Sequence, residues 1–336
     1  MHNLNKRLII HEDEKIGKAI NKINSSKIKI LFVVNKKNKL VGSVSSGDIR
    51  RSIRKKIGTD DQVKKIMCNK PRFSYLGEKT NFSNEHIISI PVINKKKQIV
   101  NFIFSKLAQK NKKNTIFLMA GGKGTRLMPL TKSTPKPLLK IKGIPIIEKI
   151  IKDFKSQGFN NFIISINYLG EKIKKYLGDG KKFNVSIKYI NEKKYLGTAG
   201  SLSLLDLKNT TFPIIVANSD LISKVDYNNL INYHVKKKAH LTICAKNKIF
   251  EMPYGEIVFN NSKIKKIIEK PTINHLVNAG IYVINKSLIN GLKKNKRLMM
   301  NDFINKHLKS NKTLLNYPIY EKWIDIGNKI DFLNAK

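Results

Sequence analysis

Residues 118–139 read LMAGGKGTRLMPLTKSTPKPLL. An apolar run at 115–120 leads into this turn-rich segment. The glycines allow a ligand to approach the backbone closely, and the prolines stiffen the chain between two cations, Arg126 and Lys136. Arginine binds phosphate oxygens as a planar fork, and lysine binds them as a point charge. The stretch therefore predicts a preorganised anion-binding loop at the end of a strand.

Two common phosphate-binding motifs do not describe this loop. No G-x-x-x-x-G-K-[ST] occurs, and the dinucleotide spacing that starts at Gly122 and Gly124 reaches Leu127 instead of a third glycine. A glycine-rich turn alone is also compatible with a tight connection from a strand to a helix. The segments around the loop are needed to decide the fold.

Apolar, strand-like segments alternate with helical segments after the loop begins. Strands are expected at 115–120, 162–167, 186–190, 212–218 and 241–245, and helices at about 145–157, 171–177 and 227–236. This alternation predicts the α/β class, with a Rossmann-like, mostly parallel sheet covered by helices on both faces. Ligands in such sheets bind beyond the carboxyl ends of the strands, which is where the glycine loop is expected.

A smaller α+β pattern precedes the loop. A helix at about 14–23 and a strand at 29–34 lead to LVGSVSSGDIRRSI, 40–53, which predicts a strand followed by a helix. The order strand, lysine-rich turn, strand then returns at 86–104 as a partial repeat. We expect three segments: an N-terminal module at 1–108, a charged linker at 109–114 and a larger domain at 115–336.

The formal net charge of +43 comes from 66 lysines and arginines against 23 aspartates and glutamates. Only seven of the basic residues are arginine, and the lysines are spread along the whole chain, whereas nucleic-acid surfaces cluster arginine and aromatic residues on one element. We therefore expect no specific nucleic-acid partner. Two distant cysteines without a C-x-x-C pair indicate neither a disulfide framework nor a zinc site.

The N-terminal residues MHNLNKRLIIHEDEK are polar and charged, unlike a signal peptide, and no apolar run approaches the length that spans a bilayer. We expect a cytoplasmic protein with no membrane partner.

GGKGTRLMPLTKSTPKPLL, 121–139, resembles the signature of the sugar-1-phosphate nucleotidyltransferases, the NDP-sugar pyrophosphorylases. Further segments resemble motifs of that family in the same order: EKKYLGTAGSL (192–202), VANSD (216–220), PYG (253–255), EKP (269–271), NAGIYV (278–283) and WIDIG (323–327). The resemblance implies a nucleotidyltransferase, GT-A-like fold and an enzyme that joins a nucleoside triphosphate to a sugar 1-phosphate, releasing pyrophosphate. In such phosphoryl chemistry the protein acts mainly by positioning and electrostatics.

The resemblance also implies a role for each matched residue. The nucleotide-binding residues would be Ala120, Gly121, Gly122, Gly124, Thr125, Glu192, Gly197 and Thr198. The catalytic cations would be Arg126 on the departing pyrophosphate, Lys136 on the phosphates undergoing exchange and Lys270 on the sugar phosphate. The sugar would be held by Gly255, Glu269 and Asn278. The cofactor Mg²⁺, a hard cation that prefers carboxylate oxygen, would be bound by Asp220 and Asp325.

Each of these residues also has an ordinary structural alternative. An aspartate after a strand often caps a helix, which is the alternative for Asp220. Asp325 is compatible with a turn cap before Gly327, and Lys270 with a surface position in a lysine-rich chain. Ser219 stands where many members of the resembled family have glycine, so a small side chain is expected beside the implied metal ligand.

Glu192 bears on the choice of nucleobase. A carboxylate can accept from both N1–H and N2–H of guanine, whereas uracil and thymine offer a single N3–H. This donor pattern favours GTP, and contact between Glu192 and the ribose is the alternative.

The segment LVGSVSSGDIRRSI resembles the strand, loop and helix of a cystathionine-β-synthase (CBS) domain, a module that binds adenine nucleotides in pairs. The resemblance implies an adenine nucleotide partner near Ser45 and Asp48. The second copy departs from the pattern, since its leading helix is not apparent, and we expect it to be truncated. A degenerate packing or dimerisation module is the alternative to a regulatory one.

A CBS module ahead of this transferase type resembles the glucosamine-1-phosphate guanylyltransferases of legionaminic acid biosynthesis. That resemblance implies transfer from GTP to glucosamine 1-phosphate, in a homo-oligomer. No hexapeptide repeat follows Gly327, so no attached acetyltransferase is expected. The alternatives are mannose- or heptose-1-phosphate guanylyltransferase, a uridylyl- or thymidylyltransferase, and a non-catalytic relative that senses nucleotides.

Overall fold

The computed structural model describes residues 7–26, 28–55, 57–78, 89–104 and 112–335. The chain forms two compact units, Met1–Gln109 and Lys110–Lys336. No helix within the described ranges combines the length and the apolar character needed to cross a bilayer.

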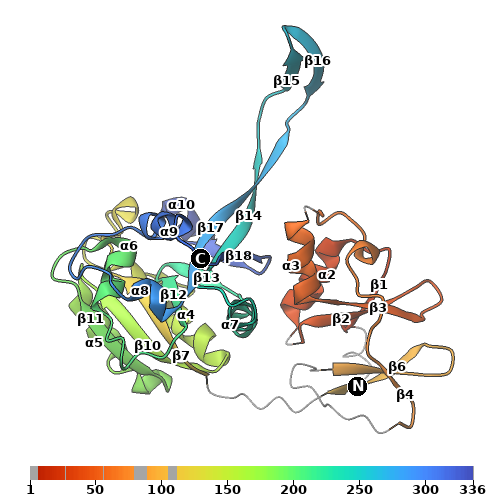
Figure 1. Ribbon diagram of the computed structural model, residues 1–336, viewed down its shortest axis with the longest axis horizontal. Coiled ribbons are helices and arrows are strands. Elements are labelled where there is room, and N and C mark those ends of the chain that lie inside the picture. Colours follow the sequence, from red (N-terminus) through yellow and green to blue (C-terminus); the bar gives the residue numbers. More distant parts are fainter. Residues whose placement is uncertain (1–6, 27, 56, 79–88, 105–111, 336) are drawn as a thin grey trace. The chain divides into compact units, whose positions relative to one another are not determined.

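The N-terminal unit contains two three-stranded sheets of the same topology (Figure 1). The first consists of β1 (Ile9–His11), β2 (Ile30–Val34) and β3 (Leu40–Ser45), and the second of β4 (Ser74–Tyr75), β5 (Ser89–Ile93) and β6 (Ile99–Phe104). In each sheet the first strand is parallel to the second and the second is antiparallel to the third. Residues 89–104 thus form the repeat that the sequence predicts, whereas 86–88 and the expected place of the missing helix, 79–88, lie outside the described residues.

One hydrophobic core joins these two sheets. Phe32 of the first sheet and Phe102 of the second lie with their ring centroids 5.4 Å apart, and Ile93 and Leu40 pack around them. The described residues of this unit include the helices α2 (Ile16–Ser25), α3 (Ser46–Arg54) and η1 (Val63–Lys65). Helix α2 begins two residues later than predicted and buries Ile16, Ala19 and Ile23, which recur at helical spacing along one face.

The C-terminal unit is built on a seven-stranded sheet with the order β11-β10-β7-β12-β17-β14-β18. Its strands are β7 (Lys112–Ala120), β10 (Phe159–Ile166), β11 (Ser186–Asn191), β12 (Ile214–Asn218), β14 (Leu241–Glu251), β17 (Thr272–Ile284) and β18 (Leu314–Ile319). All neighbouring pairs are parallel except the two that β17 makes with β12 and β14. The predicted mostly parallel sheet is confirmed. Strand β7 begins three residues earlier than expected and takes up 112–114 of the predicted linker, whose residues 109–111 are not described.

Helices cover both faces of this sheet. Strand β7 shows why: Ile116 and Leu118 are buried in one hydrophobic cluster with α4, α5 and α7, and Phe117 is buried in a second cluster with α6, α8 and α9. The bounds are α4 (Ile146–Ser156), α5 (Gly170–Leu177), α6 (Gly197–Gly200), α7 (Tyr227–Lys236), α8 (Lys286–Ile289), α9 (Met300–Leu308) and α10 (Lys329–Ala335). Burial on both faces explains why the central strands read as continuous apolar runs.

Short elements complete the described part of the unit. They are η2 (Thr125–Leu127), η3 (Lys136–Leu138), β8 (Lys140–Ile141), β9 (Ile144–Pro145), η4 (Lys181–Phe183), η5 (Ser201–Leu204), β13 (Leu221–Ser223) and β19 (Trp323–Asp325). Strands β13 and β19 pair antiparallel with each other.

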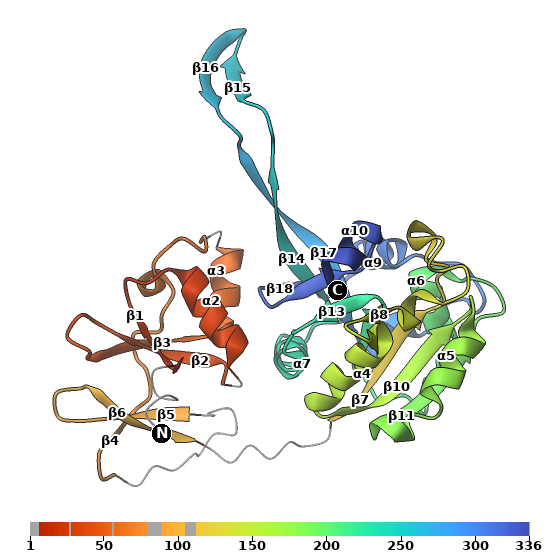
Figure 2. The same ribbon diagram turned by 180° about the vertical axis from the view of Figure 1, so that it is seen from behind.

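A long two-stranded ribbon projects from the sheet, and we call its residues Lys246–Val277 the arm (Figures 1 and 2). Its outer part is the hairpin of β15 (Glu256–Asn260) and β16 (Lys263–Ile268). Asn261 and Ser262 at the turn have φ of 47° and 65°, and two successive positive values suit the right-handed twist of a tight hairpin. The sequence did not predict the arm, because the strand expected at 241–245 continues to Glu251.

Candidate active site

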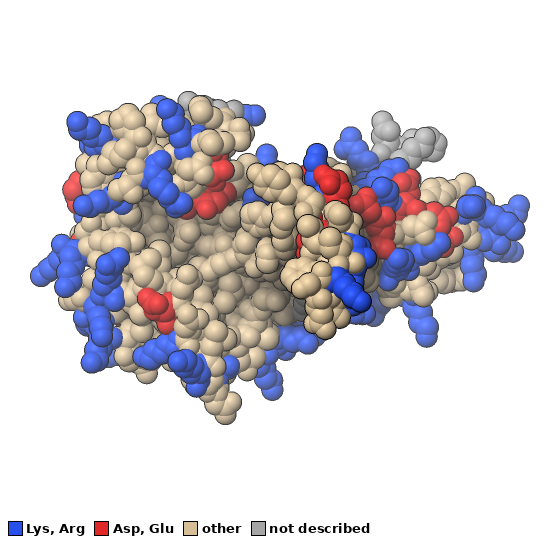
Figure 3. Space-filling model, turned by 90° about the horizontal axis from the view of Figure 1, so that it is seen from above, with Lys and Arg blue, Asp and Glu red and all other residues tan. Residues whose placement is uncertain are grey.

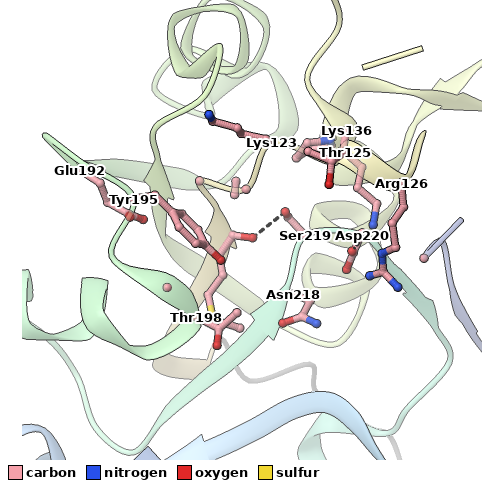
Figure 4. A pocket seen from close by; sticks show the side chains of 18 of the residues that line it. Lys123, Thr125, Arg126, Lys136, Glu192, Tyr195, Thr198, Asn218, Ser219 and Asp220 are labelled. Atoms are coloured by element: carbon pink, nitrogen blue, oxygen red, sulfur yellow. Dashed lines mark hydrogen bonds and ion pairs between the residues drawn. The ribbon is translucent and has the colours of Figure 1, made fainter. Parts of the chain in front are cut away.

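A cavity of about 650 Å³ opens at the carboxyl ends of β7 and β12 (Figure 4). The glycine loop, the loop before α6, the end of β12 and Arg297 surround it. The lining residues are Met119, Ala120, Gly121, Gly122, Lys123, Gly124, Thr125, Arg126, Lys136, Pro137, Glu192, Tyr195, Gly197, Thr198, Asn218, Ser219, Asp220, Arg297 and Gly327. The position matches the strand edge where a ligand was predicted.

The glycine loop is shaped around Lys136. Gly124 has a φ of 64°, and a Cβ there would lie 3.1 Å from Cγ2 of Thr131 and 3.2 Å from Cβ of Lys136. The Thr131 hydroxyl donates to the Gly124 carbonyl over 2.9 Å. A Cβ on Gly122, in contrast, would meet nothing within 4 Å. Gly124 therefore permits the close packing that holds Lys136, while Gly122 leaves open space.

Cations and carboxylates meet at one end of the cavity. Lys136 is 9% exposed, and its Nζ lies 2.5 Å from Oδ2 of Asp220. The other carboxyl oxygen, Oδ1 of Asp220, is buried without a hydrogen-bond partner among the described residues. Figure 4 shows Arg126 beside this pair, with its guanidinium near the Asp220 carboxylate.

Asp325 joins the group through the backbone. Strand pairing of β13 with β19 places Leu221 opposite Asp325, and the amide of Ile326 donates to the Asp220 carbonyl over 3.1 Å. Burial raises the pKa of Asp325, and the charge of Asp220 raises it further, whereas Lys136 and Arg126 lower it. Two carboxylates more than a hundred residues apart in sequence are thus neighbours on one side of the sheet.

The carboxylate of Glu192 is bound within the protein. Its side chain is 7% exposed, with Oε1 accepting from the Ser165 hydroxyl and Oε2 accepting from the Leu196 amide over 2.8 Å. The argument for guanine assumed a carboxylate turned towards the base, whereas both oxygens bind the protein. Glu192 lines the cavity, but its contacts fix the loop that leads to Gly197.

That second loop is fastened to the start of α9. Gly197 has a φ of 80°, and a Cβ there would lie 2.6 Å from the Leu298 carbonyl. The Thr198 hydroxyl accepts from the amide of Met300 over 2.8 Å. This attachment brings Arg297 to the cavity, where its guanidinium carbon lies 6.0 Å from the ring centroid of Tyr195.

The sequence reasoning missed Arg297, Tyr195, Lys123 and Asn218, which also line the cavity. A compositional signal pointed to Arg297. Residues 110–336 contain only two arginines, at 126 and 297, among many lysines, and both line the same cavity. Lysine and arginine side chains elsewhere are scattered over the face seen in Figure 3.

Ser219, where glycine was the expected residue, has a structural role. Its hydroxyl donates to the Met119 carbonyl over 2.6 Å and so ties the end of β12 to β7. Figure 4 draws this bond as a dashed line. The side chain is therefore used by the sheet and does not compete with Asp220.

The residues predicted to hold the sugar are not brought to the cavity. Gly255, Glu269 and Lys270 lie on the arm, are exposed, and are absent from the cavity lining. A Cβ on Gly255 would lie 3.2 Å from Oε2 of Glu269, so these two are close to each other. Asn278 lies at the base of the ribbon in β17, where its Oδ1 accepts from the Gly280 amide over 3.0 Å. The cavity brings together the predicted nucleotide-binding residues and the charged residues of the glycine loop, but not the residues predicted to hold the sugar.

The predicted CBS nucleotide residues are used within their own helix. Oδ2 of Asp48 accepts from the Ser45 amide over 2.8 Å and from the Ser45 hydroxyl over 2.6 Å, and the Asp48 amide donates back to that hydroxyl. Oδ1 of Asp48 pairs with Arg51. This capping box satisfies both side chains, so the geometry assigns them to starting α3 and does not support their predicted role at a ribose or phosphate.

Comparisons with known proteins agree with this architecture. A family model described as nucleotidyl transferase matches residues 114–336, and a CBS domain model matches 4–55. The putative mannose-1-phosphate guanyltransferase of Sulfolobus acidocaldarius is 32% identical over 221 residues, covering 64% of this chain and 60% of that protein. The catalytic subunit beta of mannose-1-phosphate guanylyltransferase from Drosophila melanogaster is 32% identical over 224 residues, with 65% and 60% covered. The chain spans about three fifths of the length of these curated relatives.

Solved structures give the same fold. HddC from Yersinia pseudotuberculosis complexed with GMP-PN matches with a TM-score of 0.53 and 23% identity, over 66% of this chain and 97% of that one. A putative glucose-1-phosphate thymidylyltransferase from Bacillus anthracis, in complex with a sucrose, has a TM-score of 0.53 and 25% identity, over 66% and 93%. The chain belongs to the nucleotidyl transferase family and carries a CBS domain at its N-terminal end.

Proposed function

We propose that the chain transfers a guanylyl group from GTP to a sugar 1-phosphate and releases pyrophosphate. One observation carries the proposal: Arg126, Lys136 and Asp220 line a cavity beside the glycine loop at the carboxyl ends of the strands, and Asp325 lies next to Asp220. Opposed charges of this kind suit a reaction that brings two phosphates together.

The cations of the cavity supply the electrostatics. The sugar phosphate oxygen attacks the α-phosphorus of the triphosphate, the bond to the bridging oxygen breaks, and pyrophosphate leaves with the electron pair. Arg126 and Lys123, both lining the cavity, neutralise the departing charge, and the glycine loop gives the phosphates close access to its backbone. Lys136, held by Gly124 and Asp220, is a fixed point charge at the reacting phosphates.

The carboxylates fit a divalent cation. Oδ1 of Asp220 is buried and unpaired, and Asp325 lies close enough for the two charges to repel. Magnesium binds through one or two carboxylates together with substrate phosphates, so two aspartates form a sufficient protein contribution. Asp220 and Asp325 would hold Mg²⁺, which supplies charge neutralisation at the phosphates when bound.

The choice of guanine draws on relatives and not on Glu192. The two curated relatives described above are named as guanyl- or guanylyltransferases of mannose 1-phosphate. The ring of Tyr195, 39% exposed at the cavity wall, offers an aromatic face that any base can stack on. We therefore propose GTP as the donor. For the sugar we propose mannose 1-phosphate, named for these relatives, and glucosamine 1-phosphate, implied by the CBS fusion.

The test is a matrix of ATP, GTP, UTP and dTTP against mannose, glucosamine and glucose 1-phosphates, scored by pyrophosphate release with Mg²⁺ present. We expect GTP to exceed each other triphosphate by about tenfold or more in kcat/KM, a difference of about 1.4 kcal/mol. A preference for UTP or dTTP would overturn the assignment of the base. Nucleotide binding without pyrophosphate release from any pair would identify a non-catalytic sensor.

A further inference from the structure

Arg297 differs from the other cations of the cavity in where it comes from and in its chemistry. Lys123, Arg126 and Lys136 line the cavity from the segment 118–139, whereas Arg297 lies in the loop before α9. Only seven of the 66 basic residues are arginine. Lysine supplies a point charge, but arginine alone presents a planar fork of donors. An arginine at this wall therefore suits a ligand group with two acceptors side by side.

The backbone around Arg297 is fastened to the loop that leads into α6. The amide of Leu298 donates to the Leu196 carbonyl over 2.8 Å, and the carbonyl of Leu298 accepts from two amides of α6 over 3.0 and 3.1 Å. The amide of Leu196 is held in turn by the Glu192 carboxylate. Glu192 thus acts on the cavity wall through the loop, and Arg297 projects from a fixed backbone.

The side chain of Arg297, in contrast, is available to a ligand. It is exposed, and it makes no hydrogen bond or ion pair with the residues that the structure describes. Its guanidinium carbon lies 6.0 Å from the ring centroid of Tyr195, at the outer limit of a cation–π contact. The five N–H donors of the fork are therefore not used by the described part of the chain.

Tyr195 lies on the side of the cavity away from the charged centre. Figure 4 shows its ring near Thr198, with Arg126 and Asp220 across the cavity. Phosphates bound at the charged centre would therefore direct the base of the nucleotide towards Tyr195. A base stacked on this ring lies about 3.5–4 Å from it, and a donor lies about 2.9 Å from the edge of the base. The guanidinium of Arg297 is within reach of that edge.

We propose that Arg297 recognises guanine by donating two parallel hydrogen bonds to O6 and N7 while the base stacks on Tyr195, an assignment that rests on the proposed transfer from GTP. O6 and N7 are adjacent acceptors that match the arginine fork. Adenine replaces O6 with an amino donor, and uracil and thymine have no N7. Each of these bases leaves at least one donor of Arg297 without an acceptor, which weakens its binding.

The first test uses the wild-type chain and changes the nucleotide. 7-Deaza-GTP carries carbon in place of N7 and keeps O6, the sugar and the phosphates. We expect kcat/KM for GTP to exceed that for 7-deaza-GTP by about tenfold, measured as pyrophosphate release with Mg²⁺ and a sugar 1-phosphate. Titration calorimetry of the two nucleotides gives the same ratio without turnover. Equal use and equal binding of GTP and 7-deaza-GTP would overturn the proposal.

The second test changes the protein. Arg297→Ala is expected to raise the KM for GTP by about tenfold, but the KM for 7-deaza-GTP or ATP by no more than about threefold. Arg297→Lys keeps the charge and loses the fork, so it should resemble Arg297→Ala with GTP. Lys296→Ala is the matched control, because Lys296 is exposed and does not line the cavity. Its KM values should equal those of the wild type.

The outcomes separate this proposal from the proposed function. An equal loss with GTP, 7-deaza-GTP and ATP in Arg297→Ala, largely rescued by Arg297→Lys, would assign Arg297 to the phosphates and overturn base recognition. Guanylyl transfer would then still stand, provided that the wild-type chain prefers GTP. A wild-type preference for UTP or dTTP would overturn the proposed donor itself.

Discussion

The turn after β3 and the turn after β7 differ in how their polar groups are satisfied. Both follow a strand and lead into helical backbone. After β3, Ser45 and Asp48 hydrogen-bond to each other and form the capping box of α3. Beyond β7, the loop closes on Lys136, whose partner Asp220 keeps a buried oxygen unpaired. The difference lies in whether polar groups are satisfied within the protein, which a motif does not report.

The sharpest test of this comparison is to remove the negative charge of Asp220, whose Oδ1 is unpaired. Asp220→Asn preserves shape and removes the charge, and we expect kcat to fall by about 1,000-fold or more, a barrier increase of about 4 kcal/mol. The measurement is pyrophosphate release at saturating GTP and sugar phosphate.

Asp226→Asn is the matched control. Asp226 accepts from the Asn229 amide at the start of α7 and does not line the cavity, so only a stability change is expected. Equal turnover by the Asp220 and Asp226 variants would remove Asp220 from the site.

Two glycines of the loop after β7 provide the next test of the comparison. Gly124→Ala forces a left-handed residue against Thr131 and Lys136, and we expect kcat/KM to fall by about 30-fold because Lys136 must shift. Gly122→Ala enters open space and should keep kcat/KM within about threefold. If both variants lose activity equally, the effect belongs to the ligand space and not to the packing of Lys136.

Arg297 tests the far wall of the cavity. Arg297→Ala removes the cation beside Tyr195, and we expect the KM for the nucleotide to rise by about tenfold with little change in kcat. The neighbouring Lys296 is exposed and outside the lining, so Lys296→Ala should behave as wild type in steady-state kinetics. Identical kinetics for the two variants would show that Arg297 has no part in binding.

A substitution in the turn after β3 is expected to give the smallest effect. Asp48→Ala removes the capping box of α3 and should lower the free energy of unfolding of the N-terminal unit by about 1 kcal/mol. Pyrophosphate release should not change, and thermal unfolding followed by circular dichroism measures the loss. Loss of adenine nucleotide binding by this variant, with its stability unchanged, would restore the predicted nucleotide role.

The sheet and the charged centre were predictable because they depend on strong local signals. A strand buried on both faces must be apolar throughout, and Arg126, Lys136 and Asp220 directly follow such strands or their loops. The pairing of Glu192 with Ser165 was not predictable, because it depends on the packing of two strands. The arm was not predicted, since KNKIFE (246–251) begins with three polar residues and gives no buried run.

The antiparallel pairing of β13 with β19 also has a consequence for the order of synthesis. Asp220 is made well before Asp325, which belongs to a strand close to the C-terminal helix α10. A nascent chain that has exposed the glycine loop and β12 still lacks half of its carboxylate pair. In the proposed mechanism, nucleotide turnover would begin only when residues 323–325 have left the ribosome and paired with β13.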